Sequence, residues 1–250
     1  MSNDYKYREL SGLTKALVVL LALGAGWELV SLYSSSLQLE LLNRVNFTEA
    51  EAEANNARQL AVSLLQIGLY LATVVCFGVW IVRANRNVRA LGARGLPITP
   101  GWAVGYFFVP ILNLFRPYQA MRDLMKASRD PGRWRKAAGS PIILLWWLLW
   151  IVSNIAGQAA FRISAAANNP ESLKDATQVQ IVAAVLGIFP CLAAIGVVLL
   201  ITRAQETSAD EPLSPEWPED HWQGNEPDDD DRIARRKRRA AQDDDDRIIT

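Results

Sequence analysis

The chain has very little histidine and cysteine. Its one histidine, His221, lies in the polar C-terminal part, and its two cysteines, Cys76 and Cys191, lie in apolar runs. A histidine-based metal or acid/base site in a membrane is therefore excluded, and the cysteines are expected to be small buried hydrophobes and not a disulfide. The G-x-S-x-G, H-E-x-x-H, P-loop and G-x-G-x-x-G motifs are also absent. We therefore expect no enzyme activity, no cofactor and no metal site.

Apolar residues make up 50% of the chain and gather in long runs. A transmembrane helix takes about 20 of them, which predicts spans over 13–37, 60–82, 142–160 and 179–202. The first run is longer than the apolar core of a secretory signal, which has about 7–15 residues, so we expect a retained helix. The predicted fold is all-α: a polytopic membrane helix bundle, with residues 1–203 as the membrane domain.

A shorter apolar segment, residues 102–115, lies between the second and third spans. As a helix it would reach about 21 Å, whereas the hydrocarbon core is about 30 Å thick. It contains Pro110 and Asn113 and ends at Arg116-Pro117. A re-entrant or interfacial segment is therefore predicted in place of a fifth span.

An amphipathic surface helix is predicted over 117–129, because proline favours the first turn of a helix. One face collects Tyr118, Met121, Leu124, Met125 and Ser128, and another collects Arg122, Lys126 and Arg129. Such a helix is suited to lie on a membrane surface. The sequence leaves open the alternative that its apolar face packs against the protein's own helices.

The charge distribution predicts the orientation. Residues 83–140 carry eleven basic and two acidic residues, a net charge of +9, whereas residues 38–59 and 161–178 carry two basic residues each. Because cytoplasmic loops are enriched in Lys and Arg, we expect a multi-pass protein of the cell membrane with both termini in the cytoplasm.

The expected partner is the bilayer, with anionic lipids near the basic zone. The candidate lipid-facing residues are Arg116, Arg122, Lys126 and Arg129. Protein partners are left undefined, and no nucleic acid is expected.

One candidate polar site lies within the membrane. Glu28 is an ionisable residue inside the first span, which is costly and is by default a functional candidate. Asn154, Gln158 and Arg162, at i, i+4 and i+8, form a stripe on the third span. We hypothesise that Glu28 pairs with Gln158 or Arg162. The site would be either a proton or ion path or an ordinary set of interhelical hydrogen bonds.

Several small residues suggest local geometry. Ala22 with Gly26, and Ala183 with Gly187, are small-xxx-small pairs that favour close helix approach. Gly92 is predicted to cap the helix of the second span in a left-handed conformation, and Pro190 is predicted to kink the fourth span.

Residues 204–250 are predicted to form a disordered, charged cytoplasmic tail. The repeated DDDDRI segments, at 228–233 and 243–248, flank the basic run 235–239. Blocks of like charge of this kind are typical of disordered segments.

Four segments together resemble a bacterial membrane family known as domain of unknown function 4328: W-x-x-RANRNVRALGARG from Trp80, PGWAVGYFFVPILNLFRPYQAMRDLMKAS from Pro100, SP-x-x-x-LWWLLWIVS from Ser140, and ITRAQE from Ile201. The resemblance covers roughly residues 60–206 and implies a membrane location without catalytic residues. We therefore expect a non-enzymatic scaffold or regulator whose basic cytoplasmic face and tail bind lipids or proteins. The alternative is a small transporter or channel that uses broken helices near Pro110 and Pro190.

Overall fold

The computed structural model describes residues 5–210, in which all regular structure is helical. Four helices are long: α1 (Ser11–Asn43), α2 (Glu49–Ala90), α5 (Pro141–Ala166) and α6 (Pro170–Asp210). Each is long and apolar enough to cross a membrane. They contain the four predicted spans, so the prediction of an all-α bundle with four candidate spans is confirmed.

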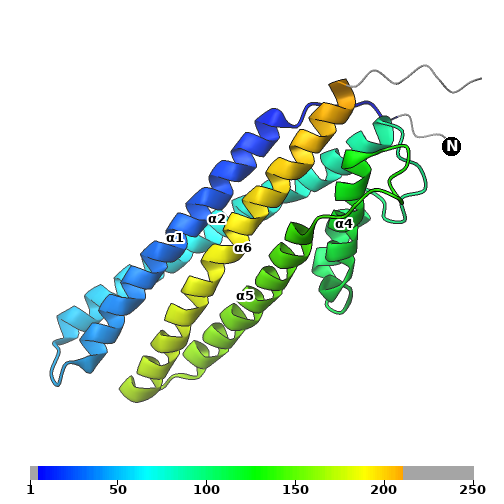
Figure 1. Ribbon diagram of the computed structural model, residues 1–250. Helices are drawn as coiled ribbons and strands as arrows, with labels where there is room; N and C mark the ends of the chain where they lie inside the picture. Colours follow the sequence, from blue (N-terminus) through cyan, green and yellow to red (C-terminus); the bar gives the residue numbers. More distant parts are fainter. Residues whose placement is uncertain (1–4, 211–250) are drawn as a thin grey trace, which may run out of the picture. The chain divides into compact units, whose positions relative to one another are not determined.

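The long helices run up and down (Figure 1). α1 packs between α2 and α6, and α6 packs between α1 and α5. The connections 44–48 and 167–169 lie at one end of the bundle, which we call the loop end. The start of α1, the ends of α2 and α6, and the chain between α2 and α5 lie at the other, which we call the hairpin end. The start of α1 and the end of α6 therefore lie at the same end of the bundle.

Residues 99–115 form a hairpin of short pieces. They contain α3 (Trp102–Gly105) and the 3₁₀ turns η1 (Tyr106–Phe108) and η2 (Leu112–Leu114). The Asn113 N–H donates to the Val109 carbonyl at 2.7 Å across the turn that holds Pro110. The two 3₁₀ turns contact each other and the helix that follows. The segment therefore returns to the end of the bundle that it left and does not form a fifth span.

Helix α4 (Arg116–Arg129) begins beside Pro117, as predicted, but its apolar face is not open to a membrane. Met121, Leu124 and Met125 are each at most 2% exposed, in one cluster with core residues of α2, α5 and α6. The surface-helix prediction is therefore wrong in this respect, and the alternative holds. The physical reason is that α6 supplies an apolar surface of its own, with Val197, Val198 and Ile201 in the same cluster.

Helix α6 also ends later than the predicted membrane domain. Gln205 is fully buried, and its side-chain amide donates to the Ala84 carbonyl at 3.1 Å and to the Ser128 hydroxyl at 3.0 Å. The Ser208 hydroxyl donates to the Ser128 carbonyl at 2.9 Å. Residues 204–210 are thus part of the bundle and not of a tail, because these bonds join α6 to α2 and α4. The rest of the predicted tail, residues 211–250, lies outside the described residues.

The segment before α1 is attached to the hairpin end. The Arg8 N–H donates to Oδ1 of Asn87 at 3.0 Å, and Nδ2 of Asn87 donates to the Arg8 carbonyl at 2.8 Å. Burial, followed by the nearby carboxylates of Glu206 and Asp210, raises the pKa of Tyr7. Residues 5–10 therefore lie against both the end of α2 and the end of α6.

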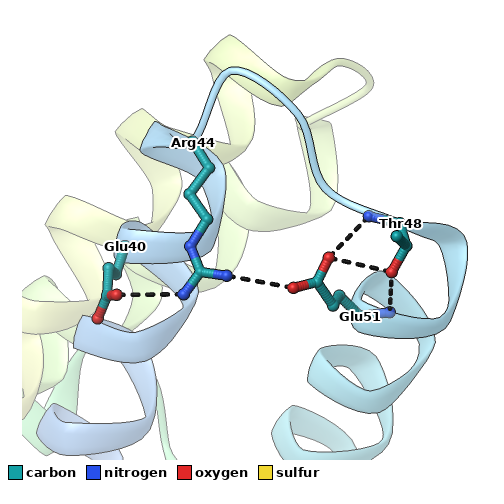
Figure 2. Close-up of polar contacts among 4 residues, drawn as sticks. All are labelled: Glu40, Arg44, Thr48 and Glu51. Atoms are coloured by element: carbon teal, nitrogen blue, oxygen red, sulfur yellow. Dashed lines mark hydrogen bonds and ion pairs between the residues drawn. The ribbon is translucent and has the colours of Figure 1, made fainter.

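Helix α2 has a defined cap at each end. At its start the Thr48 hydroxyl accepts from the Glu51 N–H and the Glu51 carboxylate accepts from the Thr48 N–H, a capping box (Figure 2). At its end Gly92 has φ +101°, and the Ala93 N–H donates to the Val88 carbonyl at 2.9 Å. This closes the helix as a Schellman motif, so the Gly92 prediction is confirmed.

The turn between α1 and α2 carries an ion-pair cluster at the loop end. Arg44 contacts a carboxylate oxygen of Glu40 and one of Glu51, each at 3.2 Å (Figure 2). Hydrogen bonds from the backbone and side chain of Thr48, and to a smaller extent Arg44, lower the pKa of Glu51. This cluster connects the two helices through the loop.

One of the two small-residue pairs does not mediate close approach. Ala22 and Gly26 are exposed, and an added Cβ at Gly26 would meet no atom within 4 Å. The face of α1 that packs carries Leu17, Leu21 and Ala25, because helical periodicity places these residues on a different side. In the second pair, Gly187 is buried and makes a close contact that belongs to the site described next.

Candidate functional site

A cavity of about 760 Å³ lies between α2 and α5, and we call it the α2–α5 cleft. Leu21 of α1 and Pro190 of α6 are among the residues that line it, since α1 and α6 pack between α2 and α5. Val104 and Phe107 of the hairpin contribute the wall at the hairpin end. The cleft therefore uses every long helix and the hairpin.

All four residues of the predicted intramembrane polar site line this cleft: Glu28, Asn154, Gln158 and Arg162. Glu28 comes from α1 and the other three from one side of α5, as the i, i+4, i+8 spacing predicts. The structure therefore brings together residues more than 120 positions apart in the chain.

The contacts of Glu28 differ from those hypothesised. Its Oε1 accepts a hydrogen bond from Nε2 of Gln66 on α2 at 3.2 Å. Between residues 5 and 210, no hydrogen bond or ion pair joins Glu28 to Gln158 or Arg162. The hypothesised pairing is therefore not found. The sequence analysis did not identify Gln66 as the partner of Glu28, although a polar carboxamide inside a predicted span is a candidate for such a contact.

Gly187 of α6 makes room for the Glu28 side chain. A Cβ added at Gly187 would lie 2.9 Å from both Cδ and Oε1 of Glu28, closer than side chains tolerate. The carboxyl group thus passes directly over the backbone of α6. A glycine at this position leaves room for the Glu28 carboxyl group there.

Only part of the polar stripe of α5 forms side-chain hydrogen bonds or ion pairs in the described part of the chain. Nδ2 of Asn154 donates to the Trp150 carbonyl one turn earlier at 2.8 Å. Arg162 is exposed and, in the described part of the chain, has no ion pair. It lies one helical turn, about 6 Å, beyond Gln158 toward the loop end.

Aromatic rings form the apolar wall of the cleft toward the hairpin end. Phe107 packs edge-on against Phe77 at 6.1 Å and against Trp150 at 6.0 Å between ring centroids. Trp150 also stacks on Trp147 at 4.8 Å. Rings that interlock in these geometries hold one another in place. The cleft therefore combines one carboxyl group, a polar stripe and a rigid aromatic wall.

The four candidate lipid-facing residues lie on α4 at the hairpin end and have different surroundings. Arg122 is half-buried and pairs with Asp123 at 2.8 Å. Arg129 donates to the Ala138 and Gly139 carbonyls, each at 3.1 Å, and so fastens the chain before α5. Arg116 lies over the Tyr106 ring at 5.7 Å. Neither Arg116 nor Lys126 forms an ion pair with the acids of residues 5–210.

Comparison with protein families identifies the chain. Residues 43–203 match the family described as Domain of unknown function (DUF4328). The chain belongs to this family. No curated protein matches the sequence, and no solved structure matches it.

The DUF4328 match includes Asn154, Gln158 and Arg162, whereas Glu28 on α1 lies before it. Its bounds agree broadly with the segments on which the resemblance was based. Family membership therefore identifies a domain of unknown function that contains three of the four helices that resemble membrane spans, since nearly all of α1 lies before the match. The chemistry of the cleft has to be argued from its own residues.

Proposed function

We propose that the protein is a non-enzymatic membrane scaffold or regulator whose hairpin end binds anionic lipid headgroups. One observation carries the proposal. The hairpin exposes large apolar side chains, with Phe108 71%, Ile111 76% and Phe115 60% exposed, directly before Arg116. An exposed apolar segment followed by cations matches the boundary between acyl chains and headgroups.

The charge at this end supports the same proposal. Basic residues from the end of α2, from α4 and from 133–136 gather there, and Arg86, Arg94 and Lys136 are exposed. Such side chains near an anionic surface contribute about 1 kcal/mol each. Arg116 and Lys126 are the best candidates, since neither forms an ion pair with the acids of residues 5–210 and neither donates to the backbone as Arg129 does.

Native mass spectrometry of the full chain in detergent tests this binding. We expect retention of phosphatidylglycerol in preference to phosphatidylcholine, and a clear loss of that preference in the double variant Arg116→Gln, Lys126→Gln. Lys174→Gln is the matched control, because Lys174 is a half-buried lysine at the loop end. Equal retention of both lipids, or an unchanged preference in the double variant, would contradict the proposal.

The orientation is part of the proposal, with the hairpin end in the cytoplasm. Single cysteines at Asn46, Asn168 and Lys136, all exposed positions, report on it after Cys76 and Cys191 are replaced by alanine. An impermeant thiol reagent applied to intact cells should label positions 46 and 168 and spare position 136. Labelling of position 136 from outside would reverse the orientation.

A small transporter is the second candidate, and the α2–α5 cleft is the observation that favours it. The expectation of a broken helix near Pro190 is not met, because α6 continues through Pro190 without interruption. Pro190 lines the cleft, whereas Pro110 lies exposed in the hairpin turn. Solute flux into liposomes that disappears in Glu28→Gln would favour transport over the scaffold.

A further inference from the structure

The α2–α5 cleft has the size and lining of a ligand site. Its volume of about 760 Å³ lies within the range of about 300–1,000 Å³ that small-molecule sites occupy. Most of its lining is apolar, with a few polar groups on α1, α2 and α5. Because the cleft lies within the apolar parts of the long helices, a ligand would meet it from the membrane.

Glu28 is the ionisable group at depth in this cleft. It is half-buried, it accepts one hydrogen bond, from Gln66, and no basic side chain of residues 5–210 forms an ion pair with it. The absence of a side chain at Gly187 leaves room for the carboxyl group against α6. A cation placed beside this carboxyl group would offset part of the cost of burying its charged form.

The surroundings of Glu28 favour an organic cation over a metal ion. Hard metal cations take about six to eight oxygen ligands or keep several waters. In residues 5–210 no group of three or more His, Cys, Asp or Glu residues is placed to hold a metal. The rings of Phe77, Phe107 and Trp150 instead offer aromatic surface, which attracts organic cations and covers their apolar parts.

We propose that the α2–α5 cleft binds a small organic cation with an apolar body, such as a hydrophobic amine or a quaternary ammonium or phosphonium ion. The cation lies at Glu28, and the apolar body lies against Phe107 and Trp150. Arg162 lies toward the loop end of the same cleft and opposes the cation there. This inference rests on the cleft alone and is independent of lipid binding at the hairpin end.

Two ions of the same shape and opposite charge test the proposal. The full chain, in phosphatidylcholine nanodiscs, is titrated by calorimetry with tetraphenylphosphonium and, separately, with tetraphenylborate, and empty nanodiscs correct for partition into lipid. We expect saturable binding of the cation and none of the anion. Equal binding of the two ions, or no saturable binding of the cation, would overturn the proposal.

Variants then locate the charge that is recognised. Glu28→Gln should bind tetraphenylphosphonium at least about tenfold more weakly, as expected when one partner of a buried charge pair is removed. Gly187→Ala should weaken it too, because the methyl group displaces the carboxyl group without removing its charge. Arg162→Gln should strengthen it. Glu53→Gln, an exposed carboxyl group outside the cleft, is the control and should bind as the wild type does. Unchanged affinity in Glu28→Gln would show that the cation binds elsewhere.

Discussion

Replacement of Gln205 tests how the hairpin end is held together. The side chain is fully buried at the junction of α2, α4 and α6. Its amide donates two hydrogen bonds, each worth about 0.5–1.5 kcal/mol net. Its Oε1 is buried and has no donor in the described part of the chain, which costs about 1–3 kcal/mol. The polar contributions therefore nearly cancel, and packing is left to determine the effect.

Two substitutions separate packing from hydrogen bonding. Gln205→Ala leaves a cavity, and we expect a loss of about 2–4 kcal/mol in the free energy of unfolding, by analogy with buried Met→Ala changes. Gln205→Met keeps the volume and removes the unsatisfied oxygen, so we expect a change of less than about 1.5 kcal/mol. Ser128 tolerates this change, because its hydroxyl still donates to the Leu124 carbonyl.

The assay is unfolding of the purified full chain by sodium dodecyl sulfate in mixed micelles, monitored by tryptophan fluorescence. Gln178→Ala is the control on the same helix, since Gln178 is exposed, and it should change stability by less than about 0.5 kcal/mol. If Gln205→Met destabilises as much as Gln205→Ala, hydrogen bonds and not packing hold this junction. If neither destabilises, the last turns of α6 do not pack as described.

Three further predictions concern the ends of α2. Asn87→Ala removes both hydrogen bonds to the Arg8 backbone and should lower the free energy of unfolding by about 1–3 kcal/mol. Hydrogen exchange at the Arg8 amide should become faster, and unchanged exchange would contradict this prediction. Gly92→Ala forces a side chain to φ +101° and should cost about 1–2 kcal/mol in unfolding assays, whereas Gly101→Ala, at φ −70° with open space around it, should be nearly neutral. The lowered pKa of Glu51 means that its contribution to stability is present above the unfolded-state pKa of about 4.3 and is lost as the pH falls through the folded-state pKa. NMR titration should show that Thr48→Ala moves this pKa upward, and Glu51→Gln should abolish the transition.

The hairpin shows how far local reasoning reaches. Residues 102–115 are too short and too rich in helix-breaking features to cross a bilayer, and these are properties of the segment itself. The structure agrees with that prediction. What covers the apolar face of the next helix, α4, cannot be predicted from the segment itself, because such a face can be buried equally well by lipid or by protein. Met121 and Leu124 are buried in one cluster with Val197 and Ile201 of α6, residues more than 70 positions away in the chain.

The candidate site divides in the same way. The stripe of Asn154, Gln158 and Arg162 follows from helical periodicity, so the sequence predicted it. That Glu28 shares a cleft with this stripe required only the correct crossing pattern of four helices. The partner of Glu28 depends on the rotation and register of neighbouring helices, which hydropathy does not define. Gln66 and Gly187 were therefore missed as its contacts.

By itself the sequence determined the quantities that depend on segment length, apolarity and charge. These are the all-α class, the four candidate spans, the interrupted fifth segment and the Gly92 cap. Only the tertiary structure decided which faces meet. The cleft, the covered face of α4 and the extension of α6 all depend on contacts between residues far apart in the chain. Such contacts are set by how side chains of different helices interdigitate, and a pattern within one helix leaves that choice open.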